Sequence, residues 1–125
     1  MNEEAKKKLE QDSDGLATYE YLANHIDNID DDLDLIIDNM QRADVSGQFT
    51  VSAIRYLFAI NPLRYATAIN RLIPSAIDKD RERRYIGDLL QSLWGKDYAD
   101  RADELCRTDD NFRRIYKRIY NSNPL

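Results

Sequence analysis

The chain has 125 residues, of which 42% are hydrophobic and 33% are charged, and its formal net charge is −5. This length and composition predict one soluble globular domain with a highly charged surface. The single cysteine, Cys106, excludes an internal disulfide framework and fits a reducing compartment. Only four glycines and three prolines occur, so we expect few turns and mostly helix.

The sequence gives no sign of a secreted or membrane-spanning protein. Residues 1–15 contain no apolar segment of the kind that a secretory signal peptide needs. The least charged run, residues 49–60, is too short to cross a bilayer and stops before a proline. We therefore expect a cytoplasmic protein without a membrane segment.

Charge is distributed unevenly along the chain. Residues 1–50 contain 13 acidic and 4 basic side chains, whereas residues 51–125 contain 10 acidic and 14 basic ones. Two interpretations remain open at this point. The two halves attract each other across the fold, or the basic half binds an acidic partner.

The N-terminal part is predicted to contain a tail and two helices. Residues 1–14 are charged and Leu9 is almost their only apolar side chain, so we expect a flexible charged tail. A helix is predicted over residues 16–26, with its cap among residues 12–14. The next helix shows the spacing of an amphipathic helix at Leu33, Ile36, Ile37 and Met40. Residues 44–48 interrupt this spacing and form a loop.

Residues 49–77 are the least polar part of the sequence and are predicted to form the centre of the fold. Residues 51–60 form a helix that is apolar nearly all round, which is typical of a central position. Asn61 as the N-cap and Pro62 at the first helical position start the following helix. Pro74 is expected to end or kink that helix.

Three more helices are predicted in the C-terminal part. One spans residues 78–94 and ends at Gly95, and the next opens at Asp97. Residues 108–110 then cap a last helix with apolar side chains at helical spacing, namely Phe112, Ile115, Tyr116, Ile119 and Tyr120. Residues 122–125 are a polar exit.

These elements predict an all-α fold. We expect a compact bundle of six or seven short helices around the central apolar hairpin of residues 49–77, with residues 15–121 as its single domain. No alternation of period two indicates a strand. A stack of helical hairpins ranks second, because we find no repeated residue pattern in the sequence.

Two acidic segments resemble metal sites in part. Residues 30–34, DDDLD, match the DDxxD motif that gathers Mg²⁺ in prenyl-chain enzymes, but helices this short leave no room for the deep cavity those enzymes need. We interpret these acids as a helix first turn, where the helix dipole favours negative charge. The loop at residues 44–49 has part of an EF-hand pattern, yet Arg42 and Ala53 stand where calcium needs ligands.

No catalytic constellation is apparent. His25 is the only histidine and lacks a second ligand at metal or catalytic spacing, so we expect a surface or capping role. Cys106 lies on the apolar face of its helix and is interpreted as a buried structural thiol. The glutamates are scattered, and the glycines form no phosphate-binding loop. We therefore predict no enzymatic activity, no cofactor and no metal ion.

Two basic clusters remain. The first, Lys79, Arg81, Arg83 and Arg84, is interrupted by acids and is interpreted as a salt-bridged helix surface. The second lies on the last helix and supplies the candidate partner-binding residues, which are Arg113, Arg114, Tyr116, Lys117, Arg118 and Tyr120. Arginines beside tyrosines can bind phosphates and stack on bases. The other interpretation is that Ile115, Tyr116 and Ile119 pack inward while the basic residues are solvated, either alone or paired with the acidic half.

These observations predict a small non-enzymatic helical module that binds another protein or a second copy of itself. The prediction depends on the missing catalytic residues, the polarised charge and the eight tyrosines, a residue type enriched at protein contacts. The alternative is a nucleic-acid-binding protein that uses the last helix. The net negative charge of the whole chain argues against nucleic-acid binding.

Overall fold

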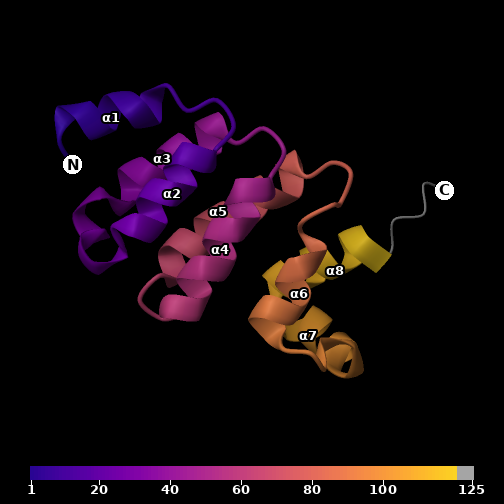
Figure 1. Cartoon of the computed structure of the whole chain (residues 1–125). Helices are drawn as coiled ribbons and strands as arrows, with labels where there is room; N and C mark the ends of the chain where they lie inside the picture. Colours follow the sequence, from indigo (N-terminus) through magenta and orange to yellow (C-terminus); the bar gives the residue numbers. More distant parts are fainter. Residues whose placement is uncertain (121–125) are drawn as a thin grey trace.

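A computed structural model describes residues 1–120 of the chain (Figure 1). Within this range the fold is entirely helical, as the sequence predicted. The α helices are α1 (Glu3–Glu10), α2 (Leu16–Asn24), α3 (Leu33–Ala43), α4 (Gln48–Ile60), α5 (Ala66–Lys79), α6 (Gly87–Trp94), α7 (Ala102–Thr108) and α8 (Asp110–Tyr120). Short 3-10 turns precede α3 and α7. The expected polar exit at residues 122–125 lies outside the described residues.

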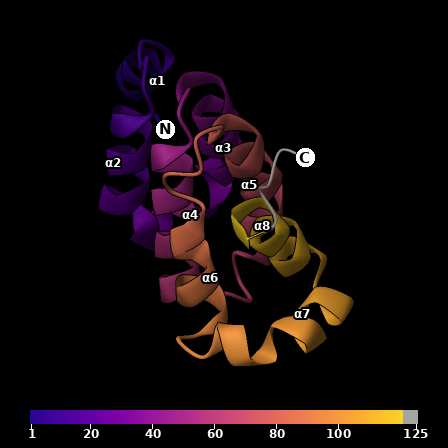
Figure 2. The same cartoon turned by 90° about the vertical axis from the view of Figure 1, so that its right-hand side faces the viewer.

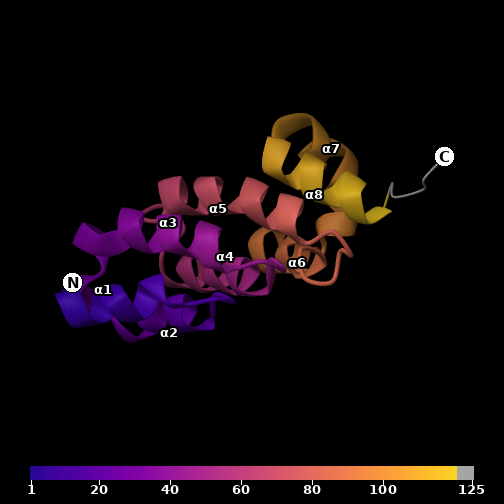
Figure 3. The same cartoon turned by 90° about the horizontal axis from the view of Figure 1, so that it is seen from above.

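The helices form two layers that run from one end of the molecule to the other. Helices α2, α4 and α6 pack side by side in one layer, and α3, α5 and α8 form the other (Figure 3). Helix α1 lies beside α2 at the N-terminal end. The view along the stack from the opposite end has α6, α7 and α8 nearest the viewer (Figure 2). Helix α7 connects the layers between α6 and α8.

The hydrophobic core is one continuous cluster that reaches from Leu9 in α1 to Ile115 in α8. Helices α4 and α5 have the most extensive helix–helix contact in the described structure, which confirms the predicted central hairpin. Leu57 is fully buried in α4, and Ile69 of α5 is 5% exposed. Tyr65, in the turn that joins the two helices, is also buried.

The expected N-terminal tail is instead helix α1. Its cap is the side chain of Asn2, whose oxygen accepts a hydrogen bond from the N–H of Ala5 at 2.8 Å. Leu9 is only 2% exposed. Its carbonyl accepts hydrogen bonds from the side chains of Asn39 (2.8 Å) and Arg42 (2.9 Å) on α3. One leucine therefore suffices to anchor this helix, because polar side chains of α3 hold its last turn.

The predicted helix that starts at Pro62 and the predicted helix of residues 78–94 both differ from the structure. Helix α5 begins at Ala66, not at Pro62, and continues through Pro74 to Lys79. Pro74 lacks an N–H to donate, but packing of the buried face on both sides of it keeps the helix continuous. The predicted helix of residues 78–94 is interrupted, because the chain turns around Asp80 before α6 starts at Gly87.

Asp44, which is 1% exposed, organises the turn between α3 and α4. One of its carboxylate oxygens accepts hydrogen bonds from the N–H groups of Ser46 (3.2 Å) and Gly47 (3.0 Å). The other oxygen accepts from the N–H (2.8 Å) and the hydroxyl (2.7 Å) of Thr50. The carboxylate therefore caps the start of α4, because it accepts from the N-cap residue Gly47 and from Thr50 in the first turn, whose N–H has no partner inside the helix.

The same arrangement occurs in two other turns. Before α2, the carboxylate of Asp12 accepts hydrogen bonds from the N–H of Gly15 (3.0 Å) and from the N–H (2.9 Å) and hydroxyl (2.5 Å) of Thr18. Before α6, Asp80 accepts from three successive N–H groups, those of residues 84–86, at 2.7–2.9 Å. All three aspartates are more than nine-tenths buried.

The hydrogen bonds at Asp12 also determine its ionisation. Burial alone would raise the pKa of this carboxyl group. The hydrogen bonds from Thr18, Gly15 and Asp14 outweigh burial and lower the pKa from 3.8 to about 2. The folded state therefore favours the charged form of Asp12.

Each of these turns packs on the next one along the stack. Gly15 and Gly47 both have left-handed backbone angles, with φ of 98° and 89°. A Cβ atom on Gly15 would lie 3.0 Å from the Cβ of Asp44, and one on Gly47 would lie 3.1 Å from the Cβ of Asp80. A side chain at either glycine would thus push against the next aspartate.

The sequence therefore does contain a repeated pattern, which was missed. Residues 12–18 and 44–50 both read Asp-x-x-Gly-x-x-Thr, and residues 80–86 keep only the aspartate. The two complete copies share no residue apart from this aspartate, glycine and threonine, so they are hard to recognise without the hydrogen bonds. The helices are arranged within the bundle as successive hairpins joined by this turn.

Candidate partner-binding surfaces

The candidate residues on the last helix do share one surface. Helix α8 buries Phe112 and Ile115 against the rest of the molecule. Its four cationic side chains are all exposed, and they are Arg113, Arg114, Lys117 and Arg118. They lie within less than half of the helix circumference, because α helices have 3.6 residues per turn.

Tyr116 and Tyr120 lie at the edge of this basic surface. The ring of Tyr116 is 5.2 Å from the ring of Phe112 and 4.6 Å from that of Tyr120. The hydroxyls of Tyr120 and Tyr98 are 2.7 Å apart. This hydrogen bond, together with burial, raises the pKa of Tyr98 to about 12. Tyr120 remains 57% exposed, so part of its ring is available for a partner.

Among residues 1–120, the acidic half of the chain pairs with α5 and the turn before it, and not with α8. Arg64 bonds to Asp30, and Arg71 lies 3.5 Å from Asp34 and 2.5 Å from Asp38. Both arginines thus bring the acidic region around α3 against the central hairpin. The attraction predicted between the two halves therefore exists, but it is confined to the middle of the stack.

The cations of α8 are far less engaged. Arg113 bonds to Asp110 on its own helix. Among residues 1–120, no ion pair or side-chain hydrogen bond forms at Arg114, Lys117 or Arg118. These three charges face solvent at the end of the molecule opposite α1 (Figure 1). The interpretation that they pair with the acidic half is therefore wrong for the described residues.

The other basic cluster lies at the same end of the molecule. Ile119 of α8 is next to Gly87, and a Cβ atom on that glycine would lie 3.6 Å from the Ile119 side chain. The second half of α8 therefore runs beside the start of α6, where the loop of residues 80–86 ends (Figure 1). We call this surface the basic end, and it comprises Arg81, Arg83, Arg84, Arg114, Lys117 and Arg118.

The first cluster is a loop and not the helix surface that the sequence predicted. Arg81, Arg83 and Arg84 are exposed within residues 80–86, and Arg84 pairs with Glu82 at 2.7 Å. Lys79 points away from them and donates hydrogen bonds to the carbonyls of Met40 and Gln41 at the end of α3. The aspartate turn at Asp80 is the physical reason that no helix forms here.

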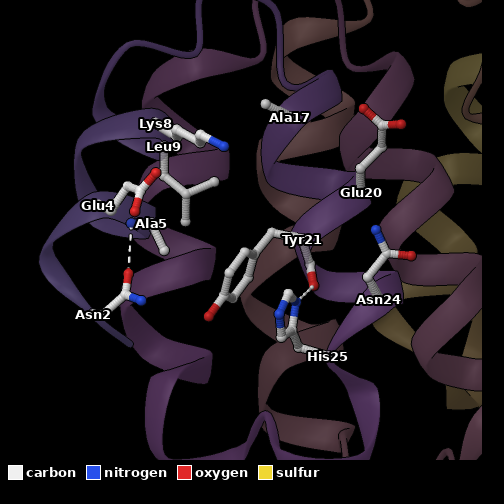
Figure 4. Close-up of a pocket in the computed structure, with 10 residues that line it drawn as sticks. All are labelled: Asn2, Glu4, Ala5, Lys8, Leu9, Ala17, Glu20, Tyr21, Asn24 and His25. Carbon is white, nitrogen blue, oxygen red and sulfur yellow. Dashed lines mark hydrogen bonds between the residues drawn. The ribbon is translucent and has the colours of Figure 1, made fainter.

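A groove of about 530 Å³ lies between α1 and α2 (Figure 4). Ala5, Leu9 and Tyr21 line it together with acidic, basic and amide side chains. His25 borders the groove, stacks on Tyr21 with ring centres 3.9 Å apart, and has its Nδ1 2.9 Å from the carbonyl oxygen of that tyrosine. The histidine is exposed and follows the last residue of α2, where the sequence placed a surface or capping role.

The acidic segments have structural partners. Residues 30–32 form a 3-10 turn, and Asp32 pairs with the amino group of Met1 at 3.3 Å. Over residues 1–120, no group of three or more His, Cys, Asp or Glu side chains has the arrangement that holds a metal ion. Cys106 is half-buried, so it is more accessible than the buried thiol that was expected.

Comparison with known proteins gives no relative. No family model, curated protein or solved structure matches the chain. In the part of the chain that is described, no helix is long and apolar enough to cross a membrane. The geometry of the surfaces is therefore the basis for any functional proposal.

Proposed function

We propose that this protein is a non-enzymatic interaction module that binds an acidic segment of another protein, or of a second copy, through the basic end. One observation carries the proposal. The acidic half of the chain engages Arg64 and Arg71, yet leaves Arg114, Lys117 and Arg118 facing solvent. A cationic surface of this kind attracts acidic partners and speeds their association.

The side chains at the basic end suit a protein partner. Arginine binds carboxylates through two parallel hydrogen bonds, so it gives geometric specificity as well as charge. Tyr116 and Tyr120 add stiff aromatic area beside the cations, and tyrosine and arginine are enriched among residues that dominate protein interfaces.

Nucleic acid is the second candidate, because α8 combines exposed cations with two tyrosines, Tyr116 and Tyr120, whose rings lie 4.6 Å apart. A long polyanion would also extend along the stack toward α3 and its acids. Electrostatic repulsion between the polyanion and the acids of α3 disfavours the binding of a long nucleic acid. A short acidic protein segment can occupy the basic end alone.

The test compares two variants with the same change in charge. The first replaces Arg113, Arg114, Lys117 and Arg118 by alanine. The matched control replaces four other exposed cations by alanine, namely Lys7, Lys8, Lys96 and Arg107. Binding is measured by fluorescence anisotropy with a labelled peptide of alternating aspartate and glycine, and with a single-stranded oligonucleotide of equal charge.

We expect the α8 variant to bind the acidic peptide at least about tenfold more weakly, which corresponds to about 1.4 kcal/mol, while the control binds as the wild type does. The difference in affinity between the α8 variant and the wild type should decrease as the salt concentration rises. Equal affinities of the two variants for the peptide would refute the proposal. An oligonucleotide that binds more tightly than the peptide, with that binding lost only in the α8 variant, would establish the second candidate instead.

A further inference from the structure

The loop between α5 and α6 differs from the other aspartate turns in one informative way. In the first two turns the residue three positions after the aspartate is a glycine with positive φ. In the third turn this residue is Arg83, with φ of 57°, the one non-glycine residue with positive φ among those described. A left-handed conformation is unfavourable for a residue with a side chain. The chain tolerates this cost and places three arginines within four residues.

A pocket of about 270 Å³ opens beside this loop. Ser46, Arg81, Arg84 and Tyr85 line it, together with Lys79, whose ammonium group is already bonded to carbonyls of α3. It is large enough for a single phosphate group with several waters, since a water molecule takes about 30 Å³ in the liquid. The pocket is therefore suited to one compact anion.

Two carboxylates also line the pocket, and their engagement differs. Asp80 is 2% exposed, and its oxygens accept hydrogen bonds from backbone N–H groups, so its charge is compensated inside the loop. Glu82 pairs with Arg84 at 2.7 Å, and both side chains are 68% exposed. Exposed pairs of this kind contribute little stability, so a stronger anion can displace the glutamate.

We propose that this loop binds a phosphoserine of an acidic partner segment, whose phosphate replaces Glu82 on Arg84. The phosphate of a phosphoserine carries nearly twice the charge of a carboxylate and has three acceptor oxygens, which arginine binds through paired hydrogen bonds. Arg81 and Tyr85 line the same pocket, and Arg81 brings a second guanidinium group to it. The inference rests on the proposed function, because the neighbouring cations of α8 would bind the acidic residues that flank the phosphoserine.

Phosphorylated protein is favoured over nucleic acid by the shape of the site. The pocket is a single local hollow between the α3–α4 turn and the loop of residues 80–86, whereas a nucleic-acid strand presents a phosphate at every nucleotide and needs a continuous cationic groove. Helix α3, with acids of the first half of the chain, packs on α5 toward the α1 end of the stack, so a strand that continued along the stack from the basic end would approach these acids.

The experiment uses three labelled peptides of aspartate and glycine that differ at the centre. One has phosphoserine, one has serine, and one has two aspartates that match the charge of the phosphoserine. Inorganic phosphate and a single-stranded oligonucleotide serve as competitors. The variants are Glu82→Gln, which frees Arg84, and the double change Arg81→Ala with Arg84→Ala, which leaves every backbone N–H donor to Asp80 in place.

We expect the wild type to bind the phosphoserine peptide about tenfold more tightly than either other peptide. Glu82→Gln should tighten this binding about threefold and leave the serine peptide unchanged. The double variant should bind all three peptides alike. Equal affinity of the wild type for the phosphoserine and two-aspartate peptides, or weaker phosphoserine binding by Glu82→Gln, would overturn the inference. More effective competition by the oligonucleotide than by the unlabelled phosphoserine peptide would assign the pocket to nucleic acid.

The two proposals can fail separately. If the α8 variant weakens binding of every peptide but the phosphoserine preference is absent, the proposed function stands and the phosphate site is refuted. If the phosphoserine preference is present but the α8 variant has no effect, the pocket stands and binding through α8 is refuted. Glu82 and Arg84 are exposed, and melting curves of their variants should match that of the wild type.

Discussion

Replacing Asp44 by alanine should be among the most destabilising single changes in this protein. The carboxylate is 1% exposed and accepts hydrogen bonds from three backbone N–H groups and from the hydroxyls of Ser46 and Thr50. Its Cβ atom also meets the turn before α2 at Gly15. The substitution keeps this Cβ contact and removes only the carboxylate, so its effect reports on the hydrogen bonds at the start of α4.

The size of the effect follows from the groups that would be left without a partner. The bonds to the N–H groups of Gly47 and Thr50 are buried, whereas the N–H of Ser46 is close enough to the surface for water to replace the carboxylate. Each buried group without a partner costs about 1–3 kcal/mol, so we expect Asp44→Ala to lower the free energy of unfolding by about 4 kcal/mol. Asp44→Asn keeps one acceptor oxygen and should lose about half of that.

The assay is urea denaturation followed by circular dichroism, with thermal melting as a second measure. A loss of 4 kcal/mol corresponds to a fall in Tm of about 15 °C for a domain of this size. Asp31→Ala is the control, since Asp31 is exposed and has no hydrogen bond or ion pair with the described residues. A loss below about 1 kcal/mol for Asp44→Ala would show that this carboxylate does not hold the turn together.

Three further measurements test other parts of the structure. The pKa of Asp12 is about 2 in the folded state and 3.8 in the unfolded state, so its contribution of about 2 kcal/mol should be complete above about pH 5 and lost as pH falls from about 4 to 2. In urea titrations Asp12→Asn should flatten this part of the curve of stability against pH, and an unchanged slope would contradict the assignment. Leu57→Ala and Ile69→Ala should each lower the free energy of unfolding by about 2–5 kcal/mol, whereas effects near zero at both would mean that the central hairpin is misplaced. Tyr120→Phe should return the pKa of Tyr98 from about 12 toward 10.0, as measured by the absorbance of the phenolate during a pH titration. The signal of Tyr98 is identified by subtracting the titration of a Tyr98→Phe variant. No change in the pKa would mean that the two hydroxyls are not bonded.

Much of the fold could be predicted because it depends on periodic burial of apolar residues. Helix α3 shows this best: its predicted spacing of Ile36, Ile37 and Met40 is the buried face in the structure. The face of α8 was predicted for the same reason, with Phe112 and Ile115 inward and the cations outward. Helical periodicity places residues on faces without knowledge of the tertiary fold.

The features that were missed depend on contacts between distant residues. Leu9 anchors α1 only because Asn39 and Arg42, about thirty positions away, hold its carbonyl. Asp80 interrupts a predicted helix because its carboxylate offers the backbone other hydrogen bonds. The two basic clusters looked unrelated, since only the antiparallel packing of α8 on α6 brings them to one end.

The aspartate turns give the molecule a modular length. The glycine of each of the first two turns packs against the aspartate of the next turn, so the two junctions between hairpins have the same contact. An extra copy of residues 44–79, inserted after residue 79, would offer its own glycine to Asp80 and its own aspartate to Gly47. Adjacent packed helices lie about 8–10 Å apart, so such a duplication would move the basic end away from the acidic half by roughly that distance. The spacing between the two opposite charges is thus a property that duplication of a single hairpin can change without altering either surface.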